Sequence, residues 1–208
     1  SCTGDPAKRA GNEFSFMMQA IQNIELLNGY QIKKIVTGCP HCFNTLKNEY
    51  PELGGDFEVI HHTQLINQLI REGKLLLKEG GSFNGKKITF HDPCYLGRAN
   101  GVYEIPRNVL KKLDAELQEM KRSKAKGLCC GAGGAQMFKE AESGDKEVNI
   151  ERTEDALEVK PDVIATGCPF CNTMMSDGVK YFEKENEIEV KDIAELIAVS
   201  YTHLTLPT

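Results

Sequence analysis

The sequence has 208 residues, of which 40% are apolar and 26% are charged, a composition typical of a globular protein with its own hydrophobic core. No apolar run approaches the roughly 20 residues that a membrane-spanning helix needs, and the chain opens on Ser1-Cys2 without the basic stretch of a signal peptide. A formal net charge of −5 argues against binding to nucleic acid. These features together predict a cytoplasmic protein.

The first 80 residues predict a helix followed by two strands, each of which leads into a further helix. Apolar side chains recur at helical spacing at Phe14, Met17, Ile21 and Ile24, which predicts a helix with these side chains in the core. A loop over residues 1–5 precedes this helix. The other predicted elements are a strand over residues 31–37, a helix over 43–50, a strand over 57–60 and a helix over 61–78.

The rest of the chain predicts a second series of strands and helices, after a glycine-rich linker over residues 79–85. Residues 117–120 fit a helix and a strand equally well, and residues 127–134 form a glycine-rich loop that carries Cys129 and Cys130. The predicted elements are a strand over residues 87–90, helices over 106–113 and 148–157, a strand over 162–166, a helix over 172–183, a strand over 187–190 and a helix over 191–198.

Two CxxC motifs occupy the same position in these two series. Cys39-Pro40-His41-Cys42 and Cys168-Pro169-Phe170-Cys171 each follow a predicted strand and precede a predicted helix, and their first cysteines lie 129 residues apart. The order of elements around each motif is also shared, which indicates an internal repeat. Short apolar strands that alternate with helices predict an α/β fold of two pseudo-symmetric repeats, each a small, mainly parallel sheet with flanking helices.

The repeat divides the chain into residues 1–80, an incomplete first repeat, and residues 81–199, a complete second repeat. The second repeat has Cys94 before its Cys129-Cys130 pair, whereas the counterpart of Cys94 would lie upstream of Ser1, and Ser1 stands in the place of Cys129. We therefore expect the sequence to be a C-terminal fragment of a longer protein. Residues 200–208 continue no helical pattern, have no counterpart in the first half and resemble a translated cloning adapter, so they are left out of the predicted fold.

The eight cysteines indicate metal or redox chemistry. A disulfide framework is typical of short secreted chains, and this chain is too long and too rich in apolar residues for that class. Zinc ribbons place two CxxC pairs roughly 15–20 residues apart, whereas a whole repeat separates them here. The adjacent thiols of Cys129 and Cys130 cannot easily bind one ion together, but they can bind two neighbouring irons. The helix after each CxxC favours the thiolate form.

These cysteines carry a resemblance to a known family. Cys94, Cys129-Cys130-Gly131 and the CxxC from Cys168 to Cys171 resemble the CCG domain, the cysteine-rich repeat found in heterodisulfide reductase and in related iron–sulfur oxidoreductases. The strings from His91 to Arg98 and from Cys2 to Pro6 are similar to the larger, membrane-linked members of that group. The resemblance covers residues 1–198.

The resemblance implies a [4Fe-4S] cluster in the second repeat, of the non-cubane kind in heterodisulfide reductase itself. Its implied ligands are the five thiols of Cys94, Cys129, Cys130, Cys168 and Cys171. The metal-binding candidates of the first repeat are Cys2, Cys39 and Cys42, and a second cluster there would need the missing upstream cysteine.

The resemblance also implies a function as an electron-transfer subunit or domain of a heterodisulfide-reductase-like oxidoreductase. It would pass electrons between a flavin dehydrogenase and a disulfide or quinone, with a flavoprotein and a ferredoxin-type domain as partners. Contact with a membrane, at its cytoplasmic face, is expected only through the missing N-terminal region. Two alternatives stay open, a zinc-stabilised scaffold without catalysis and a thiol–disulfide oxidoreductase that uses bare CxxC pairs.

Several polar side chains are weaker candidates for a role near the thiols. His41 lies inside the first CxxC as a candidate ligand or proton donor, although Phe170 fills the equivalent place. The adjacent histidines at positions 61 and 62 are expected to have a capping or core role. His91 and Asp92 directly precede a predicted ligand and are candidates for contacts behind it. Arg98 fits either an anionic substrate or a structural ion pair.

Overall fold

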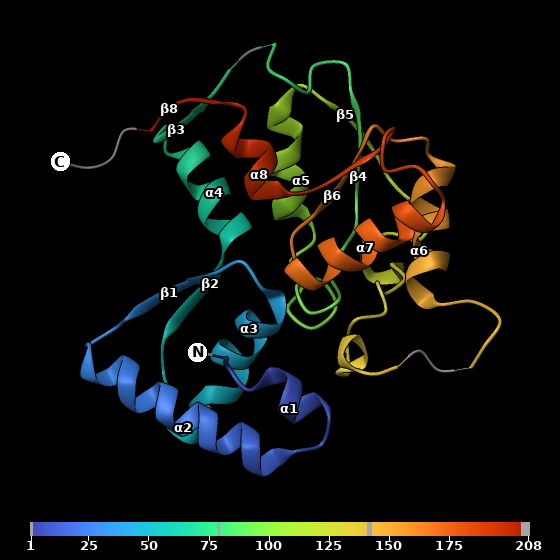
Figure 1. Ribbon diagram of the computed structural model, residues 1–208. Helices are drawn as coiled ribbons and strands as arrows, with labels where there is room; N and C mark the ends of the chain where they lie inside the picture. The colour runs from blue at the N-terminus through green and yellow to red at the C-terminus, as the bar shows by residue number, and fades with distance from the viewer. Residues whose placement is uncertain (1, 79, 141–142, 205–208) are drawn as a thin grey trace.

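The computed structural model describes residues 2–78, 80–140 and 143–204, and Figure 1 labels its elements. The helices are α1 (Asp5–Arg9), α2 (Glu13–Gly29), α3 (Pro40–Asn44), α4 (His62–Arg71), α5 (Glu104–Leu110), α6 (Val148–Glu158), α7 (Pro169–Tyr181) and α8 (Ile193–Ala198). The strands are β1 (Lys34–Thr37), β2 (Glu58–His61), β3 (Leu75–Leu77), β4 (Lys87–Phe90), β5 (Glu116–Gln118), β6 (Val163–Thr166), β7 (Glu189–Asp192) and β8 (Tyr201–Leu204).

Two parallel sheets carry the strands that lead into the CxxC motifs. β1 pairs with β2 in a two-stranded sheet, and the larger sheet has the strand order β5-β4-β6-β7. In both sheets a helix connects neighbouring parallel strands, α3 between β1 and β2 and α7 between β6 and β7. The α/β fold with two small parallel sheets, predicted from the sequence, is confirmed.

The two repeats match in detail where β1 and β2 end in the first repeat and where β6 and β7 end in the second. Thr37 of β1 pairs with His61, and Thr166 of β6 pairs with Asp192 in the same way. His61 and Asp192 each begin a helix, and the backbone N–H of each donates to the side chain three residues on, at 2.9 Å and 2.8 Å. α4 and α8 therefore start from equivalent positions.

The hydrophobic cores do not stop at residue 80, the predicted boundary between the repeats. Ile66, Leu69 and Ile70 of α4 pack against the core on one face of the larger sheet, beside Ile88 and Phe90 of β4. In the opposite direction, Leu96 from the second repeat is fully buried in the core of the first. Each repeat therefore contributes side chains to the other's core.

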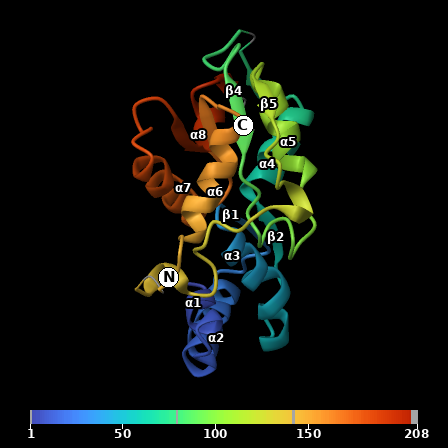
Figure 2. The ribbon, with the colours of Figure 1, turned by 90° about the vertical axis from the view of Figure 1, so that its right-hand side faces the viewer.

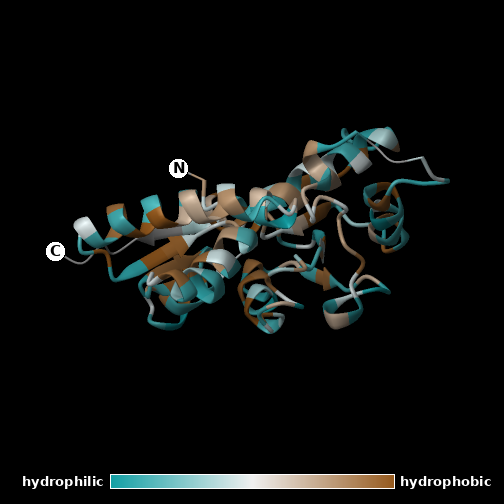
Figure 3. Ribbon diagram, turned by 90° about the horizontal axis from the view of Figure 1, so that it is seen from below, coloured by the Kyte–Doolittle hydropathy of each residue, from teal (hydrophilic) through white to brown (hydrophobic). Residues whose placement is uncertain are grey.

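Helix α2 turns a different face to the core from the predicted one. Phe14, Met17 and Ile21 are 75%, 41% and 40% exposed, whereas Phe16 and Ala20, together with Ile24, are buried. Apolar residues lie on both faces of this helix, so the spacing fits two orientations, and brown and teal alternate along it in Figure 3. Contacts that are distant in sequence select the Phe16 face, which packs on the core around the small sheet.

The predicted helix over residues 61–78 is too long. α4 ends at Arg71 because Gly73 takes a positive φ of 67°, and the N–H of Gly73 donates to the carbonyl of Ile70. The chain then forms β3, which pairs antiparallel with β8. Four of the nine tail residues left out of the predicted fold thus form a strand, and residues 205–208 lie outside the described part of the chain.

The molecule is elongated, with the CxxC helices near its middle. Figure 2 shows α1 and α2 at one end, the turn that precedes β4 at the other, and α3 between them. The longest helix of the described residues is α2, with 17 residues. Within residues 2–78, 80–140 and 143–204, no helix combines the length and the apolar character needed to cross a membrane.

Candidate metal centre

The two CxxC motifs form the same turn at the ends of β1 and β6. Cys39 and Cys168 are the N-cap residues of α3 and α7, with extended backbone, and a proline follows each at a position where the helix needs no N–H donor. The carbonyls of Cys39 and Cys168 accept the N–H groups of Phe43 and Asn172, at 2.8 Å and 2.9 Å. Both motifs therefore lie at the carboxyl ends of parallel strands.

The thiols of the second repeat converge from three segments of the chain. Cys94 lies on the turn after β4, Cys129 and Cys130 lie on the glycine-rich loop, and Cys168 and Cys171 begin α7. Cys130 Sγ donates to Cys171 Sγ at 3.3 Å, and Cys129 is hydrogen-bonded to both Cys94 and Cys130. The structure thus brings together all five predicted ligands, although their role as ligands stays a prediction.

Crowding divides these five thiols into two that ionise easily and three that do not. Hydrogen bonds from Cys130 and Cys94 hold the pKa of Cys129 well below its ordinary value, and bonds from Cys171 and Cys39 do the same for Cys168. The same contact with Cys129 raises the pKa of Cys130 to about 12 and raises the pKa of Cys94. Five thiolates cannot coexist here without a cation to offset their repulsion.

The residues fit a group that contains several metal ions. Five sulfur donors exceed the four that a tetrahedral zinc ion takes, and the neighbouring thiols of Cys129 and Cys130 suit two metal ions better than one. A ring nitrogen of His91 and the sulfur atoms of Cys130 and Cys171 all lie within 4.8 Å of one another. His91 Nε2 is also buried without a hydrogen-bond partner among the described residues.

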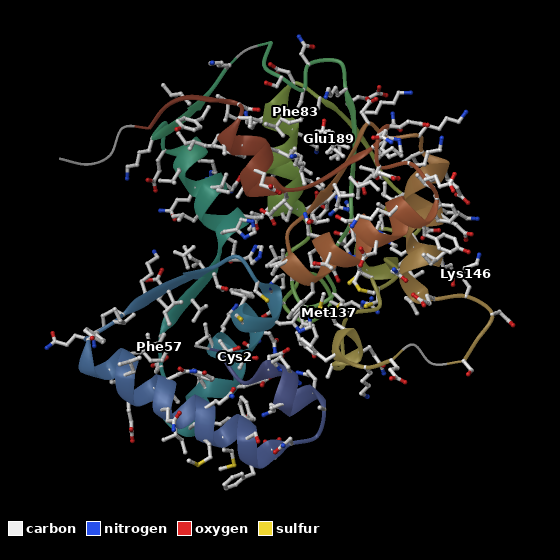
Figure 4. The ribbon with its side chains drawn as sticks, viewed as in Figure 1. Cys2, Phe57, Phe83, Met137, Lys146 and Glu189 are labelled. Atoms are coloured by element: carbon white, nitrogen blue, oxygen red, sulfur yellow. The ribbon has the colours of Figure 1, made fainter. Side chains whose placement is uncertain are left out.

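The thiols of the first repeat lie next to this group. A hydrogen bond with Cys168 is the main reason that the pKa of Cys39 rises to about 11. A thiol of the first repeat therefore contacts a thiol of the second where the two repeats meet. Contact with Cys39, together with burial, raises the pKa of Cys42. Cys2 lies further out and is exposed, on the segment labelled in Figure 4. Seven of the eight thiols therefore form one hydrogen-bonded chain from Cys42 to Cys94.

The register between the two repeats differs from the predicted one by one residue. The N–H of Gly4 donates to Cys2 Sγ at 3.4 Å, and the N–H of Gly131 donates to Cys129 Sγ at the same distance. Both glycines have positive φ, 86° and 90°, which other residues rarely adopt. The position equivalent to Cys129 is therefore occupied by Cys2, and the prediction that Ser1 stands there is wrong.

This register places a threonine where the second repeat has a cysteine. Thr3 Oγ1 donates to Cys42 Sγ at 3.5 Å, just as Cys130 Sγ donates to Cys171 Sγ at 3.3 Å. Thr3 is buried, like Cys130. The spacing of the cysteines hides the equivalence of Thr3 and Cys130, whereas the glycines at positions 4 and 131 contain the signal for it.

The first-repeat histidines have structural partners. His41 Nδ1 is 2.9 Å from Asp5 Oδ2, and its ring lies 4.3 Å from the ring of Tyr95, between centroids. His61 is the fully buried N-cap residue of α4, in agreement with the predicted capping or core role. His62 Nε2 is 2.8 Å from Asp192 Oδ1, a contact that joins the two repeats.

Three further candidates stand behind the second-repeat thiols. Asp92 accepts two hydrogen bonds from the buried Arg107, at 2.7 Å and 2.8 Å, so it braces the turn before Cys94. Arg98 donates to the carbonyl of Gly127 at 3.1 Å, which ties the Cys94 turn to the glycine-rich loop. His91 accepts a hydrogen bond from Arg152, a residue that is not among the candidates predicted from the sequence.

Apolar side chains and two hollows surround the thiols. Met137, Met174 and Phe170 pack against the buried cysteines, and Figure 4 labels Met137 on the loop below α7. A hollow of about 380 Å³ reaches Cys94 and Cys129 beside Arg98. A second hollow of about 770 Å³ opens between the repeats, where it reaches Cys39.

Comparison with known proteins agrees with this geometry. The CCG family, described as a cysteine-rich domain, matches residues 1–47 and 88–176, and these ranges contain all eight cysteines. The chain belongs to the CCG family. The structure brings cysteines from the two matched ranges into contact, because Cys39 of the first range is hydrogen-bonded to Cys168 of the second.

Several curated relatives of this CCG chain are larger proteins. It is 45% identical to the EtfAB:quinone oxidoreductase of Syntrophomonas wolfei over 94% of the chain and 28% of that relative. It is 47% identical to the probable iron-sulfur-binding oxidoreductase FadF of Bacillus subtilis, over 95% of the chain and 28% of the relative. It is 40% identical to a component of the dihydromethanophenazine:CoB–CoM heterodisulfide reductase of Methanosarcina barkeri, over 86% of the chain and 43% of the relative. The chain therefore spans less than half the length of these relatives.

Proposed function

We propose that this chain is an electron-transfer unit that binds a [4Fe-4S] cluster through Cys94, Cys129, Cys130, Cys168 and Cys171. The convergence of these five sulfur atoms from three segments is the observation that carries the proposal. The names of the relatives support it, because one is described as iron-sulfur-binding and all three are oxidoreductases or components of one. When bound, such a cluster supplies one-electron chemistry.

The chain's own residues hold the thiols in place and keep water from them. Cys130, Cys168 and Cys171 are buried, and Met137 packs over them. The N–H of Gly131 donates to Cys129 Sγ, which favours the thiolate form of that cysteine. Low solvent access and backbone donors are two of the means by which proteins set the potential of an iron–sulfur centre.

The route of the electrons is proposed from the two hollows and the chain of thiols. The hollow beside Arg98 gives a partner access to Cys94 and Cys129, and the larger hollow gives access to Cys39 on the other side. Cys39 and Cys168 are in contact between these two openings. Electrons would enter from a flavoprotein or ferredoxin-type domain at one opening and leave to a disulfide or quinone at the other.

The names of the relatives support this finer proposal in part. One relative is named for EtfAB and quinone, and another for a heterodisulfide. A flavoprotein donor and a quinone or disulfide acceptor, at the cytoplasmic face of a membrane, are proposed for the complete protein by analogy with these names. A second cluster, bound by Cys2, Cys39 and Cys42, would need a further ligand.

Anaerobic reconstitution with iron and sulfide tests the proposed function. We expect a brown protein with about four irons and four sulfides per chain, as one [4Fe-4S] cluster requires. Cys2→Ala is the matched control, because it removes an exposed thiol outside the group of five and should leave that iron in place. A colourless protein with one zinc per chain after the same treatment would contradict the proposal and favour the zinc-stabilised scaffold. A metal-free chain that cycles between CxxC dithiol and disulfide would favour the thiol–disulfide oxidoreductase.

A further inference from the structure

His91 is a buried histidine whose ring has one nitrogen occupied and one free. It follows β4, is 0% exposed, and its backbone N–H donates to the carbonyl of Ala165 on β6 at 2.9 Å. Its Nδ1 lies 2.9 Å from Nε of Arg152, which is also 0% exposed. Its Nε2 has no hydrogen-bond partner among the described residues.

Arg152 determines which nitrogen carries the hydrogen. A guanidinium group has only donors, so Nδ1 of His91 has to accept, and the hydrogen of the neutral ring then lies on Nε2. Arg152 cannot turn away, because its Nη1 donates to the carbonyl of Arg122 at 2.6 Å and to Asp155 Oδ2 at 3.1 Å. The tautomer therefore follows from contacts on the side of the ring away from the thiols.

The thiol group lies beside the ring of His91, and Nε2 is the ring nitrogen that Arg152 leaves free. A ring nitrogen of His91 and the sulfur atoms of Cys130 and Cys171 lie within 4.8 Å of one another, and Nδ1 is already taken by Arg152. A nitrogen that carries a hydrogen has no lone pair for a metal ion, so these three residues are not a three-ligand metal site. A thiolate, by contrast, accepts hydrogen bonds, and a buried N–H without an acceptor is unfavourable.

We infer that His91 donates its Nε2–H to the thiolate of Cys130 or Cys171 when the five thiols hold a metal group, and that Arg152 positions it to do so. The inference rests on the proposed function for its redox consequence. Hydrogen bonds to the sulfur atoms of an iron–sulfur centre raise its potential, because they stabilise the more negative, reduced form. His91 thus favours reduction through a hydrogen bond to a cysteine ligand and is not itself a ligand, and Arg152 is the residue that positions it.

The potential of the reconstituted chain tests this role. His91→Leu removes the donor, and we expect the equilibrium constant for reduction to fall about tenfold, which is about 59 mV for one electron. His91→Gln keeps an N–H donor and an acceptor for Arg152, so it should stay within about threefold of the original chain. The matched control is Thr89→Val, which removes another unpartnered buried polar atom from the same face of β4.

Three results would overturn the inference. One is His91→Leu with unchanged iron and unchanged potential, and another is His91→Gln that behaves like His91→Leu. If His91→Leu loses its iron, the comparison passes to His91→Gln, which must then keep both iron and potential. The third is a strong coupling between ¹⁵N of His91 and the reduced cluster in pulsed paramagnetic resonance, since it would indicate direct ligation.

The tautomer can be measured without any iron. In the diamagnetic chain loaded with zinc, ¹⁵N resonance of labelled histidine should place the hydrogen of His91 on Nε2, and Arg152→Met should allow it to move to Nδ1. A hydrogen on Nδ1 in the original chain, or a zinc–Nε2 bond, would contradict the inference. A chain that accepts zinc but never iron would overturn the proposed function, while this measurement would still decide the position of the hydrogen.

Discussion

Two turns of this protein, one in each repeat, share a backbone conformation but differ in one thiol. Cys2-Thr3-Gly4 and Cys129-Cys130-Gly131 both fold so that the glycine N–H donates to the first cysteine at 3.4 Å. The middle residue of each turn then donates to the second cysteine of the neighbouring CxxC, through oxygen in Thr3 and through sulfur in Cys130. One repeat has therefore kept the geometry of the site while it presents a hydroxyl in place of a thiol.

A second difference lies directly behind these turns. Asp5 follows Gly4 and contacts His41 at 2.9 Å, whereas the equivalent positions of the second repeat hold Ala132 and Phe170. Ala132 is buried and packs with Phe170 against the thiols. The same backbone thus carries a polar pair in one repeat and an apolar pair in the other. The comparison teaches that the turn is set by glycine and strand ends, while the chemistry of each site is set by single side chains.

The largest expected effect comes from removing a thiol of the second repeat. Cys168→Ala or Cys130→Ala should lose most of the iron of the reconstituted chain and lower its unfolding temperature, because bound metal joins segments that are far apart in the sequence. Cys39→Ala should lose much less iron, since its repeat offers fewer thiols. Iron content and thermal unfolding, both measured under argon, check this prediction.

Contact between Cys39 and Cys168 sharpens that comparison. If Cys39→Ala removes as much iron as Cys168→Ala, the two repeats share one cluster and the predicted ligand set is wrong. Cys2→Ala is the control for this comparison. Cys2 belongs to the first repeat but lies outside the hydrogen-bonded chain of seven thiols, so its removal should leave the iron in place whether or not Cys39 is a ligand.

The next largest effect is expected from restoring the missing thiol. Thr3→Cys would give the first repeat four thiols, at positions 2, 3, 39 and 42, which is the number that a [4Fe-4S] cluster or a zinc ion takes. We expect the metal bound per chain to rise above that of the original protein. Thr3→Ser is the control, since it keeps the hydroxyl that donates to Cys42 and adds no sulfur. An unchanged metal content in Thr3→Cys would show that the two turns are not equivalent.

The fold class and the position of the CxxC motifs followed from the sequence because both depend on local pattern. Short apolar strands that alternate with helices predict parallel sheets, and a motif after each strand lies at its carboxyl end. The orientation of α2 could not be obtained this way, because Phe14 and Phe16 lie on different faces and only the fold determines which is buried. The pairing of β3 with β8 joins residues 75 and 204 and leaves no local signal.

The candidate site was predictable in its cysteines but not in its supporting residues. The spacing of the eight cysteines was enough to predict which thiols come together. The positions of Gly4 and Gly131 contained the register that makes Thr3 the equivalent of Cys130. Arg152 was not predictable as a partner of His91, because it lies 61 residues away and on a different element. A buried arginine is also an exception to the rule that charged residues lie at the surface.

A smaller effect is expected from the polar pair of the first repeat. Burial alone would raise the pKa of Asp5, but hydrogen bonds with His41 and Arg9 outweigh it and leave the pKa below its ordinary value of 3.8. A carboxylate of this kind stabilises the folded state above the unfolded pKa, and the stabilisation is lost as the pH falls through the folded pKa. Asp5→Asn should therefore cost about 1–3 kcal/mol at neutral pH and progressively less below pH 4.

Unfolding by denaturant across this pH range checks the prediction. Glu13→Gln is the control, because Glu13 is an exposed acidic residue of the same repeat whose ion pair with Lys8 is long, at 3.6 Å. A difference between Asp5→Asn and the original chain that stays constant from pH 7 to pH 3 would contradict the assigned role of the Asp5 carboxylate.

The smallest effect is expected where the two repeats end. β3 follows α4 and β8 follows α8, so the tail has a counterpart after all, and the two strands pair with each other. A chain that stops after Ser200 keeps the buried Ser200 and the bond from Lys78 N–H to its carbonyl, at 2.9 Å. A two-stranded pair contributes little to stability by itself, so the truncation should lower the free energy of unfolding by less than about 1 kcal/mol.

Leu75→Ala is the control, since it removes a buried side chain of β3 and should lower the free energy of unfolding by about 2–5 kcal/mol. Denaturant unfolding measures both, and a truncation as costly as Leu75→Ala would make the tail an integral part of the fold.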